Sequence, residues 1–448
     1  MANTKPARGM RDFLPSDVRK REYVIGIIKE VYQSYGFEPL ETPSVENLET
    51  LTGKYGEEGN QLIFKILKRG EKLQEELNEG KIKSENELSD LALRYDLTVP
   101  LARVVANYKN DLPKFFKRYQ IQPVWRADRP ARGRFREFYQ CDVDAIGSSS
   151  MIVEAELCAA VSEILTRLGF DDFVIRVNHR EILYAMLDAV KIGEEKQIDA
   201  LVALDKLDKI GSEGVLREFE SRGIDKDPAD RLLRLFDELK NSDGSQILPS
   251  LSEFIGNHEA GKQGINQISQ IFKLVRLGSL KTDASLARGL SYYTGAIFEV
   301  NVPDLAGSIA SGGRYDGLIG MFGKEQIPAC GFSLGLERIL VVMEERGMFP
   351  KELSDNSADV LVTVWNEESI GESLKLATEL RQRNLCVLVY PEVDKLVKQF
   401  KYAGQINVPF VCVLGESELA ENKVTLKNMQ TGEQETIERG MVAAKIKQ

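Results

Sequence analysis

The chain has 448 residues, of which 43% are hydrophobic and 29% are charged, and its formal net charge is −10 at pH 7. This length allows roughly two to four domains with substantial cores, and the composition is typical of a soluble globular protein. No apolar run approaches the about 20 residues of a membrane-spanning helix, and residues 1–13 lack the apolar core of a signal peptide. We therefore expect a cytoplasmic protein with no membrane partner.

The first part of the chain predicts a helix followed by short extended segments. Apolar residues recur at helical spacing over Val18–Gly36, which ends at a glycine, and Phe37–Pro43 predicts a short strand closed by proline. Residues 66–92 are rich in lysine and glutamate and predict an exposed helix or loop. Residues 93–105 predict a strand, a break at Pro100 and a helix.

The segment Phe115–Gly147 predicts a long antiparallel hairpin with a polar face. It holds six arginines, and its side chains alternate with period two in two runs that are joined by residues 128–133. The shared polar face carries Arg118, Gln120, Gln122 and Arg126 from the first run and Arg134, Arg136, Gln140 and Asp144 from the second. Arginine forks bind phosphate and carboxylate groups, so this cationic segment of an acidic chain indicates a polyanionic ligand. The alternative is a solvated hairpin with surface arginines.

Residues 171–278 predict a mainly helical insertion, because amphipathic helical segments dominate this part of the chain. Next comes ARGLSYYTGAIFEV (287–300), in which Arg288 precedes a predicted strand that carries Tyr292 and Tyr293, and then SGGRYDGLIGMFG (311–323). Glycines in such strands let the backbone approach a ligand or a neighbouring strand closely.

The stretch PACGFSLGLERIL (328–340) predicts a strand over Cys330–Leu334 that leads into a helix. Arg338 then lies in the first helical turn, where backbone N–H groups and the helix dipole favour a phosphate. The alternative pairs Arg338 with Glu337 or Glu344 on a surface helix. After the linker Glu352–Ala358, strands predicted at 359–364, 385–390 and 409–414 alternate with helices, which indicates a small α/β domain with a largely parallel sheet.

The cysteines and histidines exclude several kinds of site. The five cysteines are scattered, with no CxxC pair, which argues against a disulfide framework and a zinc site. We expect Cys141 and Cys330 to be packed thiols. The two histidines, His179 and His258, lie in no motif, so we exclude Ser-His-Asp and Cys-His catalysis.

Three of these segments resemble the class II aminoacyl-tRNA synthetases. The first helix followed by Gly-Phe-x-x-Leu-x-x-Pro resembles their motif 1, the hairpin resembles motif 2, and residues 328–340 resemble motif 3. RGLSYYTG and GGRYDGL are similar to the two signature peptides of the histidyl-tRNA synthetase family and its close paralogues. The resemblance spans about residues 7–440.

The resemblance implies an α+β catalytic domain with a mainly antiparallel sheet, a helical insertion and a C-terminal α/β anticodon-binding domain. The implied bounds are 1–170 and 279–350 for the two parts of the catalytic domain, 171–278 for the insertion and 358–448 for the anticodon-binding domain. Motif 1 forms the dimer interface in this class, so a homodimer is expected.

The implied activity is ATP-dependent ligation of L-histidine to tRNA(His) through a histidyl-adenylate, with release of AMP and diphosphate. A carboxylate is already ionised at pH 7 and attacks the α-phosphate without a general base, so catalysis rests on alignment and on fixed cations. The family places Arg126 and Arg288 beside the α-phosphate and Arg338 toward the γ-phosphate. Arg288 takes a role that other class II enzymes give to a metal ion. Mg²⁺ is expected on the β- and γ-phosphates of ATP, with Glu137 as a contact and no metal site formed by protein side chains.

The resemblance also implies how histidine is held. Asp144 and Tyr293 occupy the positions that read the imidazole, while Asp96, Thr98 and Gln140 occupy those that take the α-ammonium group. Arg126, Arg288 and Tyr292 complete the implied histidine site. A site of buried hydrogen-bond partners rejects analogues that lack them by about 10⁴–10⁵-fold.

The second step joins histidine to the 3′ end of the tRNA. In the motif 2 loop, Arg129, Arg132 and Arg134 are suited to phosphate contacts with the acceptor strand. The C-terminal domain is expected to meet the anticodon, because single-stranded loops are the usual target of sequence-specific RNA readers.

The sequence departs from the family pattern at three places. Ser291 replaces an aspartate of the Arg-Gly-Leu-Asp-Tyr-Tyr peptide, Ala131 replaces a glutamine of many motif 2 loops, and LRYDLT with Asp144 replaces the LRPEGT and glutamate of another branch. Two alternatives are a regulatory paralogue of ATP phosphoribosyltransferase and a sensor domain that binds uncharged tRNA. The retained arginines and the C-terminal domain disfavour the first, and the absence of a kinase segment disfavours the second.

Overall fold

The computed structural model describes residues 4–53, 56–71, 73–74, 78, 86–240, 244–287, 292–323, 325–350, 353 and 358–447. The chain forms two compact units, Met1–Met348 and Phe349–Gln448. No helix within the described ranges is both long and apolar enough to cross a membrane.

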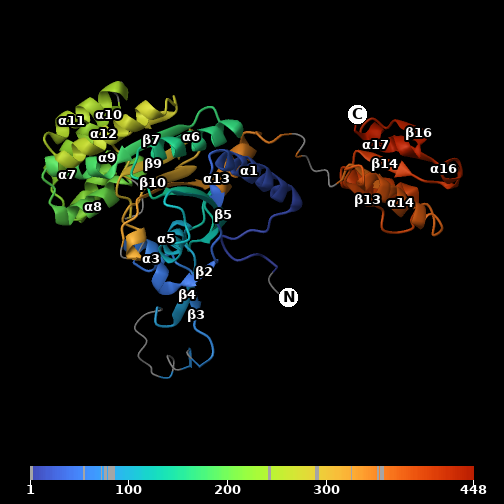
Figure 1. The fold of residues 1–448 in the computed structure, drawn as a ribbon, viewed down its shortest axis with the longest axis horizontal. Helices are drawn as coiled ribbons and strands as arrows, with labels where there is room; N and C mark the ends of the chain where they lie inside the picture. The colour runs from blue at the N-terminus through green and yellow to red at the C-terminus, as the bar shows by residue number, and fades with distance from the viewer. Residues whose placement is uncertain are drawn as a thin grey trace. The chain divides into compact units, whose positions relative to one another are not determined.

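The first unit is built on an eight-stranded sheet (Figure 1). Its strands, in spatial order, are β1 (Glu38–Pro39), β5 (Phe116–Trp125), β6 (Glu137–Ile146), β11 (Ala329–Gly335), β10 (Ala310–Arg314), β9 (Ala296–Asn301), β7 (Val174–His179) and β8 (Leu280–Thr282). The two outermost pairs, β1–β5 and β7–β8, are parallel, and the five inner pairs are antiparallel. The predicted fold class, with a mainly antiparallel sheet, is confirmed.

Period-two alternation gives the sheet one apolar face and one polar face. On β6, Cys141 and Val143 are fully buried, and the helices α1 (Pro15–Ser34), α6 (Ile152–Arg167) and α13 (Leu336–Glu345) pack around this face. The Tyr32 hydroxyl on α1 donates to the Cys141 carbonyl at 3.2 Å. The predicted first helix is therefore present, and Gly36, with φ +76°, follows its end.

Helices gather beside the β7–β9 end of the sheet (Figure 1). They are α7 (Arg180–Ala189), α8 (Glu194–Leu204), α9 (Leu207–Ser221), α10 (Lys226–Lys240), α11 (Gly244–Ile255) and α12 (Glu259–Leu274). They fall within the predicted insertion 171–278. That segment also contains β7, which pairs with β8 and β9 in the main sheet.

A smaller sheet has the strand order β2-β4-β3. The segment 66–92, which was expected to be an exposed helix or loop, begins within β3 (Lys65–Leu67) and ends within β4 (Ser89–Leu93), so the prediction is wrong at its two ends. Between the two strands, residues 71, 73, 74 and 78 are helical, as predicted. Pro100 does not break the chain, because it lies in the first turn of α5 (Thr98–Asn107), where a backbone N–H has no helical partner to lose. The remaining elements here are β2 (Val45–Asn47), α2 (Leu48–Leu51), α3 (Gly56–Gln61) and, after β10, the 3₁₀ helix η1 (Ile319–Met321).

The second unit contains the predicted α/β sheet. The parallel strands β12 (Val360–Val362), β13 (Val387–Val389) and β14 (Phe410–Val413) alternate with α14 (Ile370–Arg381) and α15 (Leu396–Gln405). Sequence analysis missed the antiparallel edge formed by β15 (Lys423–Asn428) and β16 (Gln434–Glu438), because β16 is polar and mostly exposed. The last elements are α16 (Glu416–Glu421), η3 (Arg439–Met441) and α17 (Val442–Ile446).

Candidate active site

The polar face of the main sheet carries the candidate site. The predicted hairpin is present as β5 and β6, and its register sets Arg118 opposite Asp144, Gln120 opposite Asp142 and Gln122 opposite Gln140. Residues directly opposite in a sheet share a face, so the structure brings Gln140 and Asp144 together as predicted.

Asp144 is held by two buried partners. Its Oδ2 lies 2.7 Å from Arg118 Nη2, with the two side chains 4% and 0% exposed, and the Tyr315 hydroxyl donates to its Oδ1. Burial raises the pKa of Asp144, and Arg118 opposes that shift. Gly331 faces this carboxylate from β11, where a Cβ would lie 1.9 Å from Asp144 Oδ1, so the position requires glycine.

The tyrosine pair lies next to Asp96, just before α5. Asp96 Oδ1 accepts the backbone N–H of Val99 at 3.1 Å, and the Tyr292 hydroxyl donates to Asp96 Oδ2 at 3.4 Å. The rings of Tyr292 and Tyr293 are 5.1 Å apart, and Tyr293 lies against Gly313. Both tyrosines precede β9 and do not lie within it, which corrects the predicted strand.

Two other predicted histidine contacts lie near these groups. Thr98 is the first residue of α5 and is half-buried. Gln140 is buried, and its Nε2 donates to Ser333 Oγ on β11 at 2.7 Å.

Arg126 follows β5 and is already oriented. Its Nε donates to the Tyr95 carbonyl at 3.1 Å, and its Cζ lies 4.2 Å from the centre of the Tyr95 ring. The centre of the Phe138 ring lies 5.3 Å from the same atom. One edge and the plane of the guanidinium are thus fixed, which prepares the fork for an oxyanion.

Arg338 lies in the first turn of α13, as predicted, and its Nη1 donates to the Ser308 carbonyl. The motif 2 loop passes close by, because a Cβ at Gly133 would lie 3.2 Å from Arg338 Cγ. Glu337 and Glu344, the partners of the alternative interpretation, instead contact Arg21 and Lys20 at 2.9 Å and 2.6 Å.

The loop arginines differ in their surroundings. Arg129 is exposed. Arg132 pairs with Glu345 and donates to the Asp304 carbonyl at 2.9 Å, and Arg134 makes two hydrogen bonds to Asp128, at 2.8 and 2.9 Å.

Two further predicted contacts are Arg288 and Glu137. Arg288, with Ser291, lies outside the described residues. Glu137 begins β6 opposite Trp125, and alternation places it on the face opposite to that of Gln140 and Asp144. This register does not favour the predicted contact between Glu137 and ATP.

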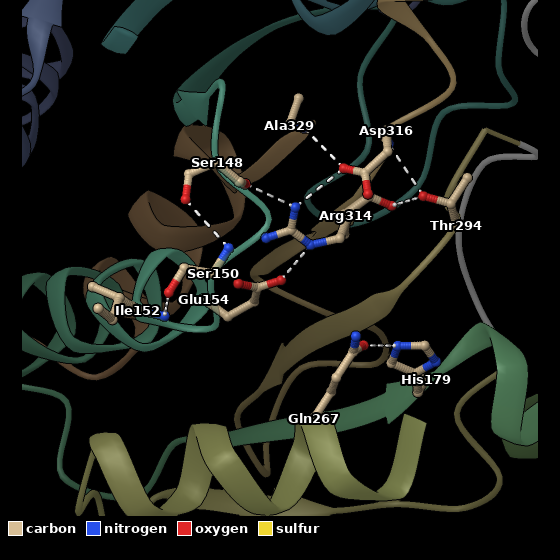
Figure 2. A network of polar contacts seen from close by, with 10 residues as sticks. All are labelled: Ser148, Ser150, Ile152, Glu154, His179, Gln267, Thr294, Arg314, Asp316 and Ala329. Atoms are coloured by element: carbon tan, nitrogen blue, oxygen red, sulfur yellow. Dashed lines mark hydrogen bonds and ion pairs between the residues drawn. The ribbon is translucent and has the colours of Figure 1, made fainter. Parts of the chain in front are cut away.

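A buried ion pair fixes the turn that carries Tyr315 (Figure 2). Arg314 Nε donates to Glu154 Oε1 at 2.6 Å, and its Nη1 donates to Asp316 Oδ1 at 3.1 Å. Asp316 Oδ1 also accepts the N–H of Ala329, while the N–H of Asp316 donates to Thr294 Oγ1. These bonds hold the residue between Arg314 and Asp316, namely Tyr315, over Asp144.

The cysteines and histidines described next are packed in the core or cap helices. Cys141 and Cys330 are fully buried, as predicted, and burial raises the pKa of each thiol. His258 caps α12, and its Nε2 lies 3.0 Å from Asp188. His179 caps α7 through Nδ1, which accepts the N–H of Glu181, and its Nε2 contacts Gln267 (Figure 2).

His179 is expected to make stability fall in mild acid. Burial lowers the pKa of His179 from 6.5 to about 4. Between these two pH values the histidine is protonated in the unfolded chain and neutral in the folded chain. The resulting loss in the free energy of unfolding grows as the pH falls below 6.5 and approaches about 3 kcal/mol near pH 4. The free energy of unfolding, measured in urea, should therefore fall less between pH 7 and pH 4.5 in His179→Asn than in the wild type. Asparagine still caps α7 in this variant. An equal loss in both proteins would contradict the assignment.

Sequence analysis assigned no role to Arg118, Tyr315 and Asp142, although all three lie beside predicted contacts. Arg118 was placed on the polar face, and Tyr315 is part of GGRYDGL. The pairing register of the hairpin would have placed Arg118 opposite Asp144. That register depends on which residues of the two strands pair first after the loop.

Comparisons with known proteins show the family of this chain. A model of the family described as histidyl-tRNA synthetase matches residues 9–339, and a model of the anticodon-binding domain matches residues 359–448. The histidine–tRNA ligase of Cytophaga hutchinsonii is 44% identical over 95% of this chain and 96% of its own. That of Christiangramia forsetii is 41% identical over 98% of each. The crystal structure of histidyl-tRNA synthetase from Nostoc sp. PCC 7120 superposes with a TM-score of 0.81 and 32% identity, covering 100% of this chain and 99% of that one.

The fold and the site define the catalytic core of a class II aminoacyl-tRNA synthetase, with an anticodon-binding domain after it. The mainly antiparallel sheet agrees with this class. The chain belongs to the histidyl-tRNA synthetase family, as the sequence motifs predicted.

Proposed function

We propose that this protein attaches L-histidine to tRNA(His) in two steps, through a histidyl-adenylate, and releases AMP and diphosphate. The observation that carries the proposal is the placement of an oriented arginine, Arg126, near a buried set of carboxylates and amides. The arginine suits a phosphate and a carboxylate, while the acidic set suits a cationic amino acid.

The first step needs no general base. The α-carboxylate of histidine is ionised at neutral pH and attacks the α-phosphate directly. In the proposal Arg126 binds that carboxylate and the α-phosphate, Arg288 stands on the other side of the α-phosphate, and Arg338 meets the γ-phosphate at the start of α13. Charge that develops on the phosphoryl oxygens then faces cations that need little rearrangement.

The amino acid is held through its two polar ends. Asp144 and Tyr293 would read the imidazole, and Asp96, Thr98 and Gln140 would take the α-ammonium group, with Tyr292 holding Asp96. Arg118 and Tyr315 support this arrangement, because both contact Asp144. Arg118 favours the charged form of the buried carboxylate, and a charged acceptor is what an imidazole N–H binds best.

ATP is the proposed second substrate, with Mg²⁺ on its β- and γ-phosphates. Within the described residues no group of three or more histidine, cysteine or acidic side chains could hold a metal. Mg²⁺ that is bound through substrate phosphates and water needs only one or two carboxylates from the protein. The register of Glu137 disfavours it for that role, so we assign no protein contact to the ion.

We propose a cytoplasmic homodimer in which α1 and β1 belong to the dimer interface. In the proposed organisation residues 1–170 and 279–350 form the catalytic domain, 171–278 form the insertion, and 358–448 bind the anticodon. The motif 2 loop meets the acceptor end of the tRNA.

Histidine-dependent exchange of pyrophosphate into ATP tests the first step directly. We expect exchange with L-histidine and none with the other amino acids. A protein that shows no exchange with any amino acid would refute the enzymatic function and would leave the two non-catalytic alternatives.

Arg129 and Arg132 should act only in the second step. The double variant Arg129→Ala/Arg132→Ala is expected to raise the KM for tRNA by about 10- to 100-fold, because two contacts to phosphate charges are lost. Pyrophosphate exchange should stay unchanged. The matched control is Arg167→Ala on α6, since the side chains of Arg132 and Arg167 are 47% and 46% exposed and both are ion-paired. Equal losses in exchange and in tRNA charging would argue against a tRNA contact.

A further inference from the structure

The candidate amino-acid site contains a third carboxylate, Asp142, to which the family resemblance gives no role. It is 2% exposed and lies on β6 between Gln140 and Asp144, on the same face. Gln120 faces it from β5 and Ser333 faces it from β11.

Two buried acceptors at this place have neither a hydrogen bond nor an ion pair among the described residues. They are Oδ1 of Asp142 and Oε1 of Gln140. Ser333 lies directly opposite Asp142 in the pairing of β11 with β6, and its Oγ accepts from Gln140 Nε2 at 2.7 Å. Buried acceptors are nearly always satisfied in folded proteins, so two open acceptors on one face of the sheet indicate a missing donor.

The charges around Asp142 indicate that this donor is cationic. Asp96 and Asp144 each interact unfavourably with it, and the opposing cation, Arg118, is ion-paired with Asp144. Burial is the largest effect and raises the pKa of Asp142 to about 7, while Arg118 lowers it. A ligand that carries a positive charge and several N–H donors would satisfy both open acceptors and relieve the repulsion.

We propose that Asp142, together with Gln140, binds the α-ammonium group of the amino-acid substrate. Ser333 accepts from Gln140 and lies opposite Asp142, whereas Asp144 is held separately by Arg118 and Tyr315. An ammonium group has three donors and no acceptor, which suits two open acceptor oxygens on the same face of the sheet. The inference rests on the proposed function, because it names a further binding residue for the same substrate.

The variant Asp142→Asn tests this assignment through substrate analogues. In pyrophosphate exchange, the KM for histidine should rise about 10- to 100-fold, since a hydrogen bond to a charged group is lost, and the KM for ATP should stay within about twofold of wild type. Histidinol keeps the ammonium group, so its inhibition constant should rise with the KM for histidine. Imidazolepropionate lacks the ammonium group, so its inhibition constant should not change. An unchanged KM for histidine, or an equal loss for imidazolepropionate, would overturn the proposal.

Thermal unfolding separates binding from a structural role. Asparagine has the shape of aspartate without its buried charge, so Asp142→Asn should unfold at the same temperature as the wild type or higher at pH 8. Glu46→Gln is the control, because Glu46 is also buried but is hydrogen-bonded to Arg103 at 2.6 Å; its unfolding temperature should fall and its KM for histidine should not change. If Asp142→Asn does not fold, Ser333→Ala gives a second comparison, because it removes the hydroxyl that accepts from Gln140 and lies opposite Asp142. Wild-type protein without exchange would refute the proposed function itself, whereas wild-type exchange with an unchanged variant refutes only the role of Asp142.

Discussion

Replacing Arg126 by alanine is expected to lower kcat/KM for histidine-dependent pyrophosphate exchange by about 100- to 1,000-fold. This is the usual effect of removing one fixed donor that faces charge developing in a transition state. The side chain already contacts the rings of Tyr95 and Phe138, with one N–H bonded to the Tyr95 carbonyl. Because that position is set before ATP binds, little reorganisation accompanies the reaction. Exchange of labelled pyrophosphate under saturating ATP measures the loss.

The conservative variant Arg126→Lys distinguishes charge from geometry. Lysine keeps the positive charge but offers a point donor in place of a planar fork, so we expect activity between those of the wild type and Arg126→Ala. Thermal unfolding of both variants should stay close to wild type, because the Arg126 side chain is only half-buried. Exchange by Arg126→Ala within threefold of the wild-type rate would remove this arginine from the catalytic set.

Replacing Arg118 by alanine is expected to lower the free energy of unfolding by about 3–5 kcal/mol, because it leaves the carboxylate of Asp144 buried without its cation. The two side chains are 0% and 4% exposed. Burial already raises the pKa of Asp144 and Arg118 opposes that shift, so without Arg118 the carboxyl takes up a proton more readily in the folded state. The loss should therefore be larger at pH 8 than at pH 5. Urea unfolding at both values measures it.

The neighbouring ion pair supplies the control for this prediction. Lys117 and Glu156 lie 3.1 Å apart with side chains 26% and 42% exposed, and such a pair contributes about 0–1 kcal/mol. Lys117→Ala should therefore change stability far less than Arg118→Ala. Combining Arg118→Ala with Asp144→Asn should recover part of the lost stability, since no unpaired charge remains. Equal effects of the two single variants would show that burial of the Arg118–Asp144 pair does not matter.

Much of the site could be predicted from short segments of sequence. Alternate residues of a strand share a face, so Gln140 and Asp144 had to lie together once the hairpin was predicted. Arg338 follows from a strand, two glycines and a helix start. The same local reasoning failed at Pro100, where proline fits the first turn of α5, and at the two ends of residues 66–92, where two short strands pair with each other.

By itself, the sequence determined the class of the protein, the polar face of the hairpin and the set of arginines suited to ATP. These features depend on periodicity and on motifs that lie within a few residues of one another. The tertiary structure decided which groups neutralise each other: Tyr315 reaches Asp144 from 171 positions away in the chain, and Arg118 meets it only through the hairpin register. The tertiary structure also leaves one side-chain oxygen of Asp142 and one of Gln140 without a hydrogen-bond partner among the described residues. Burial and pairing between distant segments set these charges, and no local pattern encodes them.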